Sequence, residues 1–169
     1  MNVFAEQLHG TISAPPSKSA LHRRLILNRI AGVCDAPSNV CSDIETTARC
    51  LRKIGTDAVV DCAESGSTLR FLVPVSLLFG GATFCGSDSL KARPIKPLLD
   101  LLRTHGAVID SDSLPLDVRG SLSSGSYTLD GGISSQFFSG LLMTLPFLDG
   151  DSTLQWNTPL GSAVYVALT

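Results

Sequence analysis

Three stretches of this chain share one plan, and this repetition constrains the fold more than any other feature of the sequence. Each stretch opens on hydroxyl residues, continues through an apolar run of helix length and ends at a glycine. The stretches cover residues 17–32, 65–80 and 134–150. Helices with so few polar side chains are expected to be buried on most sides. The pattern therefore predicts three core helices, each with polar groups gathered at its N-terminal end.

Two amphipathic helices and several short β-type stretches are expected between these core helices. Ser42 and Asp43 should cap one amphipathic helix that ends at Gly55, and Pro94 should open the other, which ends at Gly106. The expected strands are 57–61, 82–85, 107–110, 116–119, 126–129 and 153–156. This order predicts an α/β fold built from a repeated unit. Residues 161–169 look like the start of a further amphipathic helix, so we expect the third unit to be truncated.

Composition and charge exclude several classes of protein. The chain has 169 residues, 44% of them hydrophobic and 17% charged, with a formal net charge of −2. The longest apolar run, near residues 71–82, is interrupted by proline and glycine and is too short to cross a bilayer. No basic leader or signal segment opens the sequence, which favours a cytoplasmic location. The acidic balance, without aromatic residues among the basic ones, argues against nucleic acid as a partner.

No metal or cofactor site is expected from the sequence. The five cysteines form no C-x-x-C pair, and only three histidines accompany them. Structural zinc sites need four such ligands at characteristic spacings. Neither metal nor cofactor therefore enters the predicted chemistry.

The first core stretch carries the strongest signal for anion binding. Lys18, Ser19 and Arg23 stand at the start of the expected helix, and residues 7–34 contain no acidic side chain. A helix N-terminus offers unpaired N–H groups and a partial positive charge, which together favour phosphate or carboxylate ligands. The plain alternative is a capped helix with solvated basic residues. His22 is expected to pack and not to catalyse.

The other two core stretches repeat this signal more weakly. Gly66 lies among hydroxyl residues at the second helix start, and Arg93 stands on a loop before a helix. Ser134, Ser135 and Gln136 open the third stretch with uncharged donors and acceptors. Each of these is equally compatible with ordinary helix capping. If the three helix ends meet at one place, their dipoles and donors add, which predicts a site for a small, multiply charged ligand.

Five motifs then identify a family. They are Pro-x-Ser-Lys-Ser-x-x-x-Arg at 15–23, Ser-Gly-Ser-Thr-x-Arg at 65–70, Arg-Pro-Ile at 93–95, Ser-Ser-Gln-Phe at 134–137 and Ser-x-x-Tyr at 162–165. In this order they resemble the 5-enolpyruvylshikimate-3-phosphate synthase family over essentially the whole chain. The resemblance implies one lobe of repeated βαβαββ-type units, as in the enolpyruvyl transferase fold. It further implies that residues 1–13 form a strand that pairs with a C-terminal lobe absent from this chain, and that residues 14–169 form an incomplete N-terminal lobe.

The resemblance also implies an activity and a set of ligand-binding residues. The activity is transfer of the enolpyruvyl group from phosphoenolpyruvate to shikimate 3-phosphate, in the shikimate pathway to aromatic amino acids. The implied shikimate 3-phosphate ligands are Lys18, Ser19, Arg23, Ser134, Ser135, Gln136, Ser162 and Tyr165. The implied phosphoenolpyruvate ligands are Lys18, Gly66, Arg93 and Gln136, with Lys18 as the catalytic contact to both substrates and Arg70 in a supporting role. The acid–base carboxylates belong to the other lobe, so this chain alone is expected to be inactive.

Two departures and two alternatives accompany this interpretation. Pro16 and Glu64 stand where many members have glycine and asparagine, and Glu64 is expected to turn away from the site or pair with a basic neighbour. One alternative is the enolpyruvyl transferase that acts on UDP-N-acetylglucosamine. It resembles this chain less, because its first motif lacks Ser-Lys-Ser-x-x-x-Arg and it relies on a loop cysteine, whereas Cys85 falls in a predicted strand. The other alternative is a non-catalytic anion-binding fragment.

Overall fold

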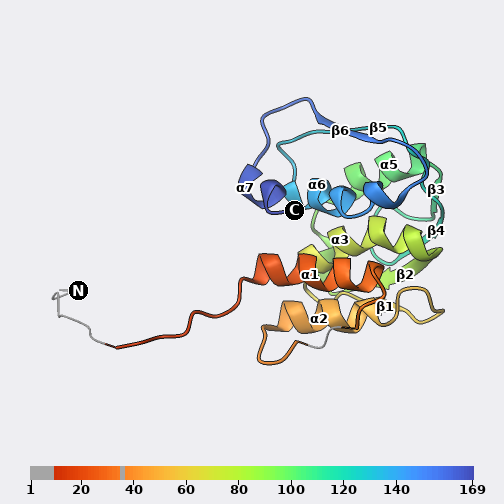
Figure 1. Ribbon diagram of the computed structural model, residues 1–169. Helices are drawn as coiled ribbons and strands as arrows, with labels where there is room; N and C mark the ends of the chain where they lie inside the picture. The colour runs from red at the N-terminus through yellow and green to blue at the C-terminus, as the bar shows by residue number, and fades with distance from the viewer. Residues whose placement is uncertain (1–9, 35–36) are drawn as a thin grey trace.

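The computed structural model describes residues 10–34 and 37–169. The helices are α1 (Lys18–Ile30), α2 (Ser42–Leu51), α3 (Gly66–Ser76), α4 (Asp88–Lys91), α5 (Lys96–Thr104), α6 (Ser135–Leu142) and α7 (Ala163–Ala167), with 3₁₀ turns at Leu77–Phe79 and Leu145–Phe147. The strands are β1 (Val60–Asp61), β2 (Gly81–Cys85), β3 (Ala107–Ile109), β4 (Leu116–Gly120), β5 (Ser126–Leu129) and β6 (Thr153–Trp156). The expected α/β class is confirmed, and Figure 1 shows the helices stacked beside the strands.

The repeat is visible in how the strands pair. The middle unit runs β1, α3, β2, α5, β3, β4 and forms a four-stranded sheet in the order β1-β2-β4-β3, so its main elements follow the βαβαββ order. Strands β1 and β2 are parallel, while β4 is antiparallel to both β2 and β3. The next unit begins in the same way, because β5 and β6 are parallel and α6 connects them. Helix α7 follows where the middle unit has α5.

The first unit differs from this pattern. In the described residues before β1, the structure contains α1 and α2 and no strand. The strand expected over 1–13 lies largely outside the described residues, and positions 10–13 form no strand, so its pairing with another lobe stays a prediction. The described part of the first unit therefore contributes helices to the core and no strand to either sheet.

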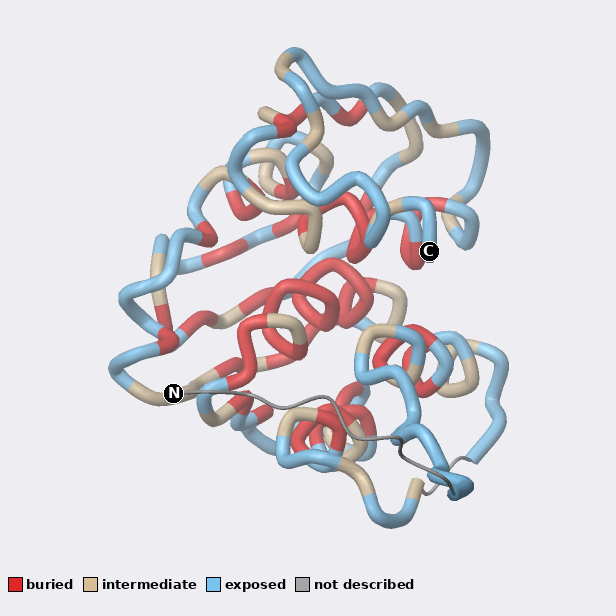
Figure 2. Tube along the Cα trace, turned by 90° about the vertical axis from the view of Figure 1, so that its left-hand side faces the viewer, coloured by how far each residue is buried: buried red, intermediate tan, exposed pale blue. Residues whose placement is uncertain are grey.

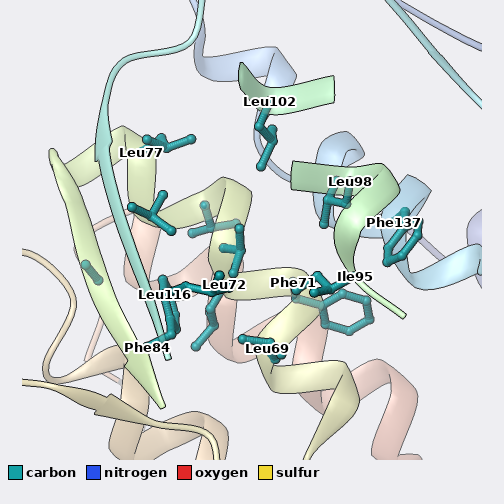
Figure 3. Packing of buried hydrophobic residues seen from close by; sticks show 14 of the residues in the cluster. Leu69, Phe71, Leu72, Leu77, Phe84, Ile95, Leu98, Leu102, Leu116 and Phe137 are labelled. Atoms are coloured by element: carbon teal, nitrogen blue, oxygen red, sulfur yellow. The ribbon is translucent and has the colours of Figure 1, made fainter. Parts of the chain in front are cut away.

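Helix α3 lies at the centre of the core. Ten of its eleven residues are buried, and it lies between α1 and α6 (Figure 1). In Figure 3, Leu69 and Leu72 of α3 face Phe84 of β2 and Leu116 of β4. Figure 2 shows the buried segments gathered in the middle of the molecule, with exposed chain around them. The prediction of a core helix is confirmed here most fully.

Helix α1 is less buried than its apolar sequence predicted. Its buried side chains are His22, Arg23, Leu25 and Ile26, whereas Leu27 is 39% exposed. Two of these four buried residues, His22 and Arg23, are polar. The expectation of burial on most sides is wrong for α1: α2 and α3 pack against it, but Ala20, Arg24 and Leu27 remain exposed.

Several helix boundaries also differ from the sequence prediction. The N-cap of α2 is Cys41, which makes no side-chain capping bond, and Ser42 and Asp43 lie inside the first turn. Helix α5 begins at Lys96 and not at Pro94, because the Pro94 carbonyl instead accepts a hydrogen bond from Arg70 (2.9 Å). The four-residue helix α4 was not predicted; it is too short to show an apolar period, and Ser87 caps it.

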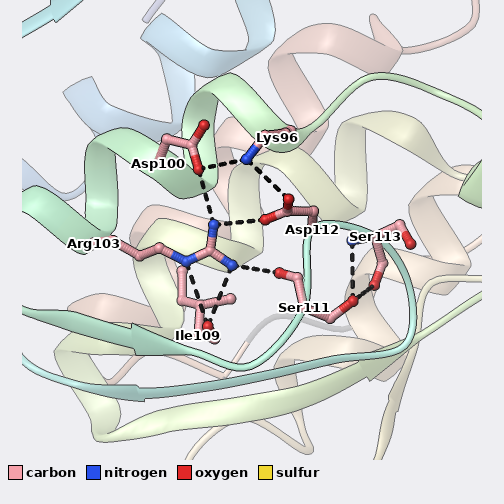
Figure 4. Close-up of polar contacts among 7 residues, drawn as sticks. All are labelled: Lys96, Asp100, Arg103, Ile109, Ser111, Asp112 and Ser113. Atoms are coloured by element: carbon pink, nitrogen blue, oxygen red, sulfur yellow. Dashed lines mark hydrogen bonds and ion pairs between the residues drawn. The ribbon is translucent and has the colours of Figure 1, made fainter.

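An ion-pair network fastens α5 to the segment after β3 (Figure 4). Arg103 contacts Asp100 at 2.9 Å and Asp112 at 2.7 Å, and Lys96 contacts the same two carboxylates at 3.0 and 2.9 Å. Arg103 also donates to the Ser111 carbonyl at 2.6 Å. Every charge in this cluster has an opposite partner, so the cluster is locally neutral.

No helix in the described part of the chain is long and apolar enough to cross a membrane.

Candidate anion-binding site

The N-terminal ends of α1, α3 and α6 point to the same side of the molecule (Figure 1). Each helix is capped by a serine, because Ser17, Ser65 and Ser134 accept bonds from backbone N–H groups at 3.3–3.4 Å. None of the three helices has an acidic residue in its first turn. The positive ends of the helix dipoles therefore face the same region without carboxylates of their own to neutralise them.

A close contact between α3 and α6 brings two of these ends together. Pro74 lies inside α3 and has no N–H to donate, which leaves the carbonyl of Arg70 without its helical partner. Gly140 of α6 packs against this carbonyl, and a Cβ at Gly140 would lie 2.7 Å from the Arg70 oxygen and 3.1 Å from Pro74 Cγ. Only glycine permits this approach. The spacing between the starts of α3 and α6 thus depends on the contact between Arg70 of α3 and Gly140 of α6.

An open cavity of about 500 Å³ lies where the helix ends meet. Its lining comes from α1, α3, α6 and α7, together with the turns before α6 and α7. It includes Lys18, Ser19, His22, Arg23, Ser67, Phe71, Gly132, Ile133, Ser134, Ser135, Gln136, Ser139, Gly161, Ser162 and Tyr165. The predicted convergence of the three helix starts is confirmed. All eight residues predicted for the shikimate 3-phosphate subsite line this one cavity.

Arg23 is the most deeply held cation of the cavity, only 6% exposed. Its Nη2 donates to Ser139 Oγ at 2.7 Å and to the Tyr165 carbonyl at 2.5 Å, and its Nε donates to Thr169 Oγ1 at 2.8 Å. The guanidinium lies 5.3 Å from the centre of the Phe71 ring. Burial lowers its pKa, yet an arginine stays charged at neutral pH. Arg23 therefore fastens α7 to α1 and α6 while it lines the cavity.

Lys18 stands at the rim, with its side chain 50% exposed. Its ammonium contacts the carboxylate of Asp43, in the first turn of α2, at 2.5 Å. This hydrogen bond raises the pKa of Lys18 above its ordinary value. Lys18 therefore carries a full positive charge at neutral pH and lies beside the cavity.

A second basic cluster lies over Gly66, at the start of α3. A Cβ at Gly66 would fall 2.9 Å from Arg70 Nη1 and 3.0 Å from Arg93 Nη1, so both guanidinium groups approach the backbone closely. Burial, together with the charge of Arg93, lowers the pKa of Arg70. No ion pair within the described ranges joins Arg23, Arg70 or Arg93 to a carboxylate. Two like charges held together without a counter-charge favour an anion between them.

Gln136 connects the cavity to this second cluster. Its Oε1 accepts a bond from Arg70 Nη1 at 2.8 Å, and its Nε2 donates to Ser67 Oγ at 2.8 Å. Of the four residues predicted for phosphoenolpyruvate, Lys18 and Gln136 line the cavity, whereas Gly66 and Arg93 lie beside it, across Gln136. Gln136 thus lies between the cavity and the Arg70–Arg93 cluster, and its position between two ligand subsites stays a prediction.

Three other predicted residues have clear positions. Ser162 has φ 53°, a left-handed conformation that is uncommon outside glycine, and its side chain makes no capping bond to α7. His22 is 1% exposed, bonds Thr47 Oγ1 through Nδ1 at 2.8 Å and packs edge-on against Phe71, so it packs as expected. Glu64 is exposed, with no ion pair to a described residue.

Sequence reasoning missed three contributors to the site, and it had given Ser67 only as one of the hydroxyl residues around Gly66. Phe71 lies five residues beyond Gly66, and Ser139 lies one helical turn beyond Ser135. A helical-face argument from the predicted residues could have found them. Asp43 gave no usable signal, because it lies 25 residues from Lys18 and was interpreted as a helix cap. The described residues include no group of three or more side chains suited to a metal ion.

The comparisons with known proteins agree with this geometry. The family model for EPSP synthase (3-phosphoshikimate 1-carboxyvinyltransferase) matches residues 55–169. The 3-phosphoshikimate 1-carboxyvinyltransferase of Clostridium novyi (strain NT) is 34% identical over all of this chain and 47% of the relative. The enzyme of that name from Clostridium kluyveri is 36% identical, over all of this chain and 46% of the relative. The solved EPSP synthase of Acinetobacter baumannii superposes with a TM-score of 0.74 at 18% identity, covering 94% of this chain and 42% of that one.

The fold is thus an α/β repeat whose helix starts meet at one cavity, and the sequence matches define the family: this chain belongs to the EPSP synthase family. The chain spans about half the length of the curated relatives it matches. Its alignment with the Clostridium novyi relative covers 206 positions, more than the 169 residues of this chain, so the relative carries segments that this chain lacks.

Proposed function

We propose that this chain supplies the N-terminal lobe of an enzyme that transfers the enolpyruvyl group of phosphoenolpyruvate to the 5-hydroxyl of shikimate 3-phosphate, with release of phosphate. The observation that carries the proposal is the cavity at three helix N-termini, where Arg23 in the lining and Arg70 and Arg93 beside it have no carboxylate partner among the described residues. Both substrates carry phosphate and carboxylate groups, which such a site binds. The relatives' name supplies the reaction.

In this proposal the cavity binds shikimate 3-phosphate. Ser19, Ser134 and Ser135 present hydroxyl and backbone donors to the phosphate at two helix starts, with Lys18 at the rim and Arg23 beneath. Ser162 and Tyr165 close the side formed by α7, and Gln136 contacts the cyclohexene ring of the substrate. The free hydroxyl of Ser162, held on a left-handed residue, suits a ligand contact because no helix N–H occupies it.

Phosphoenolpyruvate then binds over Gly66, against Arg93 and beside Lys18 and Gln136. The two substrates meet at Lys18, whose ammonium faces the negative charge of both. The oxygen of the 5-hydroxyl adds to C2 of phosphoenolpyruvate while a proton goes to C3. Loss of phosphate and of a proton from C3 then regenerates the double bond on the product. Fixed cations stabilise the anionic intermediate without reorganisation, which is a large part of such catalysis.

We further propose that the acid–base groups come from a second lobe, so this chain alone gives no turnover. Closure of two lobes would also exclude water from the cavity, which is open here. A cytoplasmic location belongs to the same proposal, since the shikimate pathway supplies aromatic amino acid synthesis.

A chimaeric enzyme tests this function. In it, the chain replaces the matching segment of the Clostridium kluyveri relative, and release of phosphate from the two substrates is measured. We expect phosphate release from the chimaera, none from its Lys18→Met version and none from the chain alone. A folded chimaera that binds neither substrate would contradict the proposal. Turnover by the chain alone would contradict the need for a second lobe.

The two alternatives predict different outcomes. A non-catalytic anion-binding fragment predicts a chimaera that binds ligand without turnover. The transferase acting on UDP-N-acetylglucosamine needs a reactive loop cysteine, and Cys85 is the last residue of β2, where burial and the nearby Asp61 raise the pKa of its thiol. A raised pKa leaves little thiolate at neutral pH. A thermal-shift comparison of shikimate 3-phosphate with UDP-N-acetylglucosamine would separate the two enzymes.

A further inference from the structure

Three helix starts meet around one carboxylate in this structure. Asp43 lies in the first turn of α2, and its side chain accepts a hydrogen bond from Lys18, the first residue of α1. The nearby hydroxyl of Ser65, the N-cap of α3, helps to lower the pKa of this carboxyl. Asp43 does not line the cavity, whereas Lys18 does. Asp43 therefore contacts Lys18 from outside the cavity.

A buried chain of hydroxyl groups supports this carboxylate. Ser65 Oγ accepts from Thr68 Oγ1 at 2.7 Å, and Thr68 Oγ1 contacts Thr47 Oγ1 at 2.7 Å. Thr47 Oγ1 also bonds the Asp43 carbonyl at 3.1 Å and His22 Nδ1 at 2.8 Å. Thr47 and Thr68 are fully buried, and His22 and Ser65 nearly so. The chain crosses the core between α1, α2 and α3, and it returns to the residue at which it starts.

The local charges explain why Asp43 is ionised. Partial burial disfavours its charge, but Lys18, His22 and Ser65 more than offset this, so the pKa of Asp43 lies below its usual value. The other titratable groups that face Lys18 and His22 are Arg23 on α1 and Cys41 at the start of α2. A carboxylate here is favoured by the helix ends around it as well as by the lysine.

A free lysine would be a poor catalytic cation. Its side chain has four rotatable bonds and loses considerable entropy when a ligand fixes it. Half of the Lys18 side chain is exposed, so burial alone does not hold it. The contact with Asp43 holds the ammonium at the cavity rim before any ligand arrives. Preorganisation of this kind improves binding by reducing the ordering cost.

We propose that Asp43 is a positioning residue for Lys18, and that the buried chain Ser65, Thr68, Thr47 and His22 holds Asp43 in place. The role rests on the proposed function, because it concerns the same ligand site. It assigns Asp43 to the site although Asp43 does not line the cavity. It also explains why a hydroxyl chain crosses an otherwise apolar core: the chain ties the carboxylate to the three helix starts.

The test uses Asp43→Asn, which keeps the shape and removes the charge. Glu45→Gln is the matched control, because Glu45 is also acidic, lies in the same first turn and is exposed. The first readout is the pKa of Lys18, followed by NMR of its side chain in the 169-residue protein. We expect Asp43→Asn to lower this pKa and Glu45→Gln to leave it unchanged. An unchanged pKa in Asp43→Asn would overturn the proposal whether or not the protein binds substrate.

The second readout is the affinity for shikimate 3-phosphate, measured by NMR titration in a double-mutant cycle with Lys18→Met. We expect Asp43→Asn to weaken binding about tenfold in the wild-type background and to have no further effect when Lys18 is already Met. An equal loss in both backgrounds, or tighter binding by Asp43→Asn, would overturn the positioning role. A Lys18→Met variant that binds like the wild type would instead overturn the proposed function of the site.

Thr47→Val tests the supporting chain without touching either charge. It removes the shared hydroxyl at nearly constant volume, so the packing of α2 is kept. We expect a lower pKa of Lys18 and a loss of affinity intermediate between those of the control and Asp43→Asn. A folded Thr47→Val protein with the wild-type pKa of Lys18 and the wild-type affinity would show that the hydroxyl chain does not hold Asp43 in place.

Discussion

Basic side chains gather in two places on this molecule, and their partners differ. In the network of α5, Arg103 and Lys96 share Asp100 and Asp112 (Figure 4). At the helix starts, carbonyl, hydroxyl and amide groups bind Arg23 and Arg70, Arg93 lies close to Arg70 over Gly66, and the described residues give none of the three a carboxylate. The first arrangement satisfies its own charges. The second keeps its positive potential for a ligand, so the partners of a basic residue are more informative than its presence.

A fall in pH should distinguish the two basic regions most strongly, because it should reduce stability through His22 at the helix starts before it affects the α5 network. Burial lowers the pKa of His22 to about 4, below its value of about 6.5 in an unfolded chain. The unfolded state then binds more protons between these values, so stability falls as the pH drops from 6.5 to 4, by about 3 kcal/mol in total. Lys96 and Arg103 lower the pKa of Asp112 in the α5 network, so that contribution is lost only at still lower pH. Denaturant unfolding of the wild type and of His22→Asn between pH 4 and 7.5 measures the difference.

The His22→Asn variant should not lose this part of its free energy of unfolding between pH 6.5 and 4, whatever its stability at neutral pH. Equal slopes of stability against pH in both proteins would show that His22 is not the buried group that resists protonation.

Gly140→Ala should disturb the site through packing alone. The added methyl would lie 2.7 Å from the Arg70 carbonyl, so α6 must move away from α3. Overpacking of this kind costs about 2 kcal/mol of stability. It should also separate the helix starts and weaken shikimate 3-phosphate binding, whereas the ion pairs of α5 stay intact. Chemical denaturation and ligand titration of the same sample check both expectations. Unchanged binding by a destabilised protein would show that the helix spacing does not set the site.

Gly66→Ala should act on the second subsite with little loss of stability. Its Cβ would lie 2.9 Å from Arg70 Nη1 and 3.0 Å from Arg93 Nη1, and both are flexible side chains that can move. Their displacement should weaken phosphoenolpyruvate about tenfold and shikimate 3-phosphate less than twofold, in the chimaeric enzyme. A separate KM for each substrate gives the answer. An equal effect on both substrates would place Gly66 in a shared site.

Arg103→Gln should have the smallest effect on function. The variant loses the contacts to Asp100 and Asp112 and the bonds to the carbonyls of Ile109 and Ser111. Because the network is largely exposed, we expect a melting temperature only a few degrees lower and unchanged affinity for either substrate. A loss of substrate affinity in Arg103→Gln would mean that the two basic regions are coupled.

The sequence predicted the elements that carry a local signal. Strands β5 and β6 match their predicted ranges, and the three serine-capped helices begin within two residues of the hydroxyl clusters. All eight residues of the shikimate 3-phosphate prediction line one cavity, because short motifs fix both the helix start and the donors. Their roles toward ligands stay predictions.

The features that the sequence did not reveal depend on distant contacts. The 3.6-residue period gave no sign that α1 lies at the edge of the core, since its exposed Leu27 is as apolar as its buried Ile26. Asp43 was assigned to a cap, since only the fold brings it to Lys18. The start of α5 was placed at Pro94, whose carbonyl is bound by Arg70 from another helix. In each case a tertiary contact decided between two locally acceptable structures.

The most direct test of the central claim is an NMR titration of the 169-residue protein with shikimate 3-phosphate. The account predicts saturable shifts of the backbone amides at the three helix starts, at residues 18–20, 66–68 and 134–136, with no shifts around Arg103. Shifts that fail to saturate, or that gather at α5 and leave the helix starts unchanged, would contradict it.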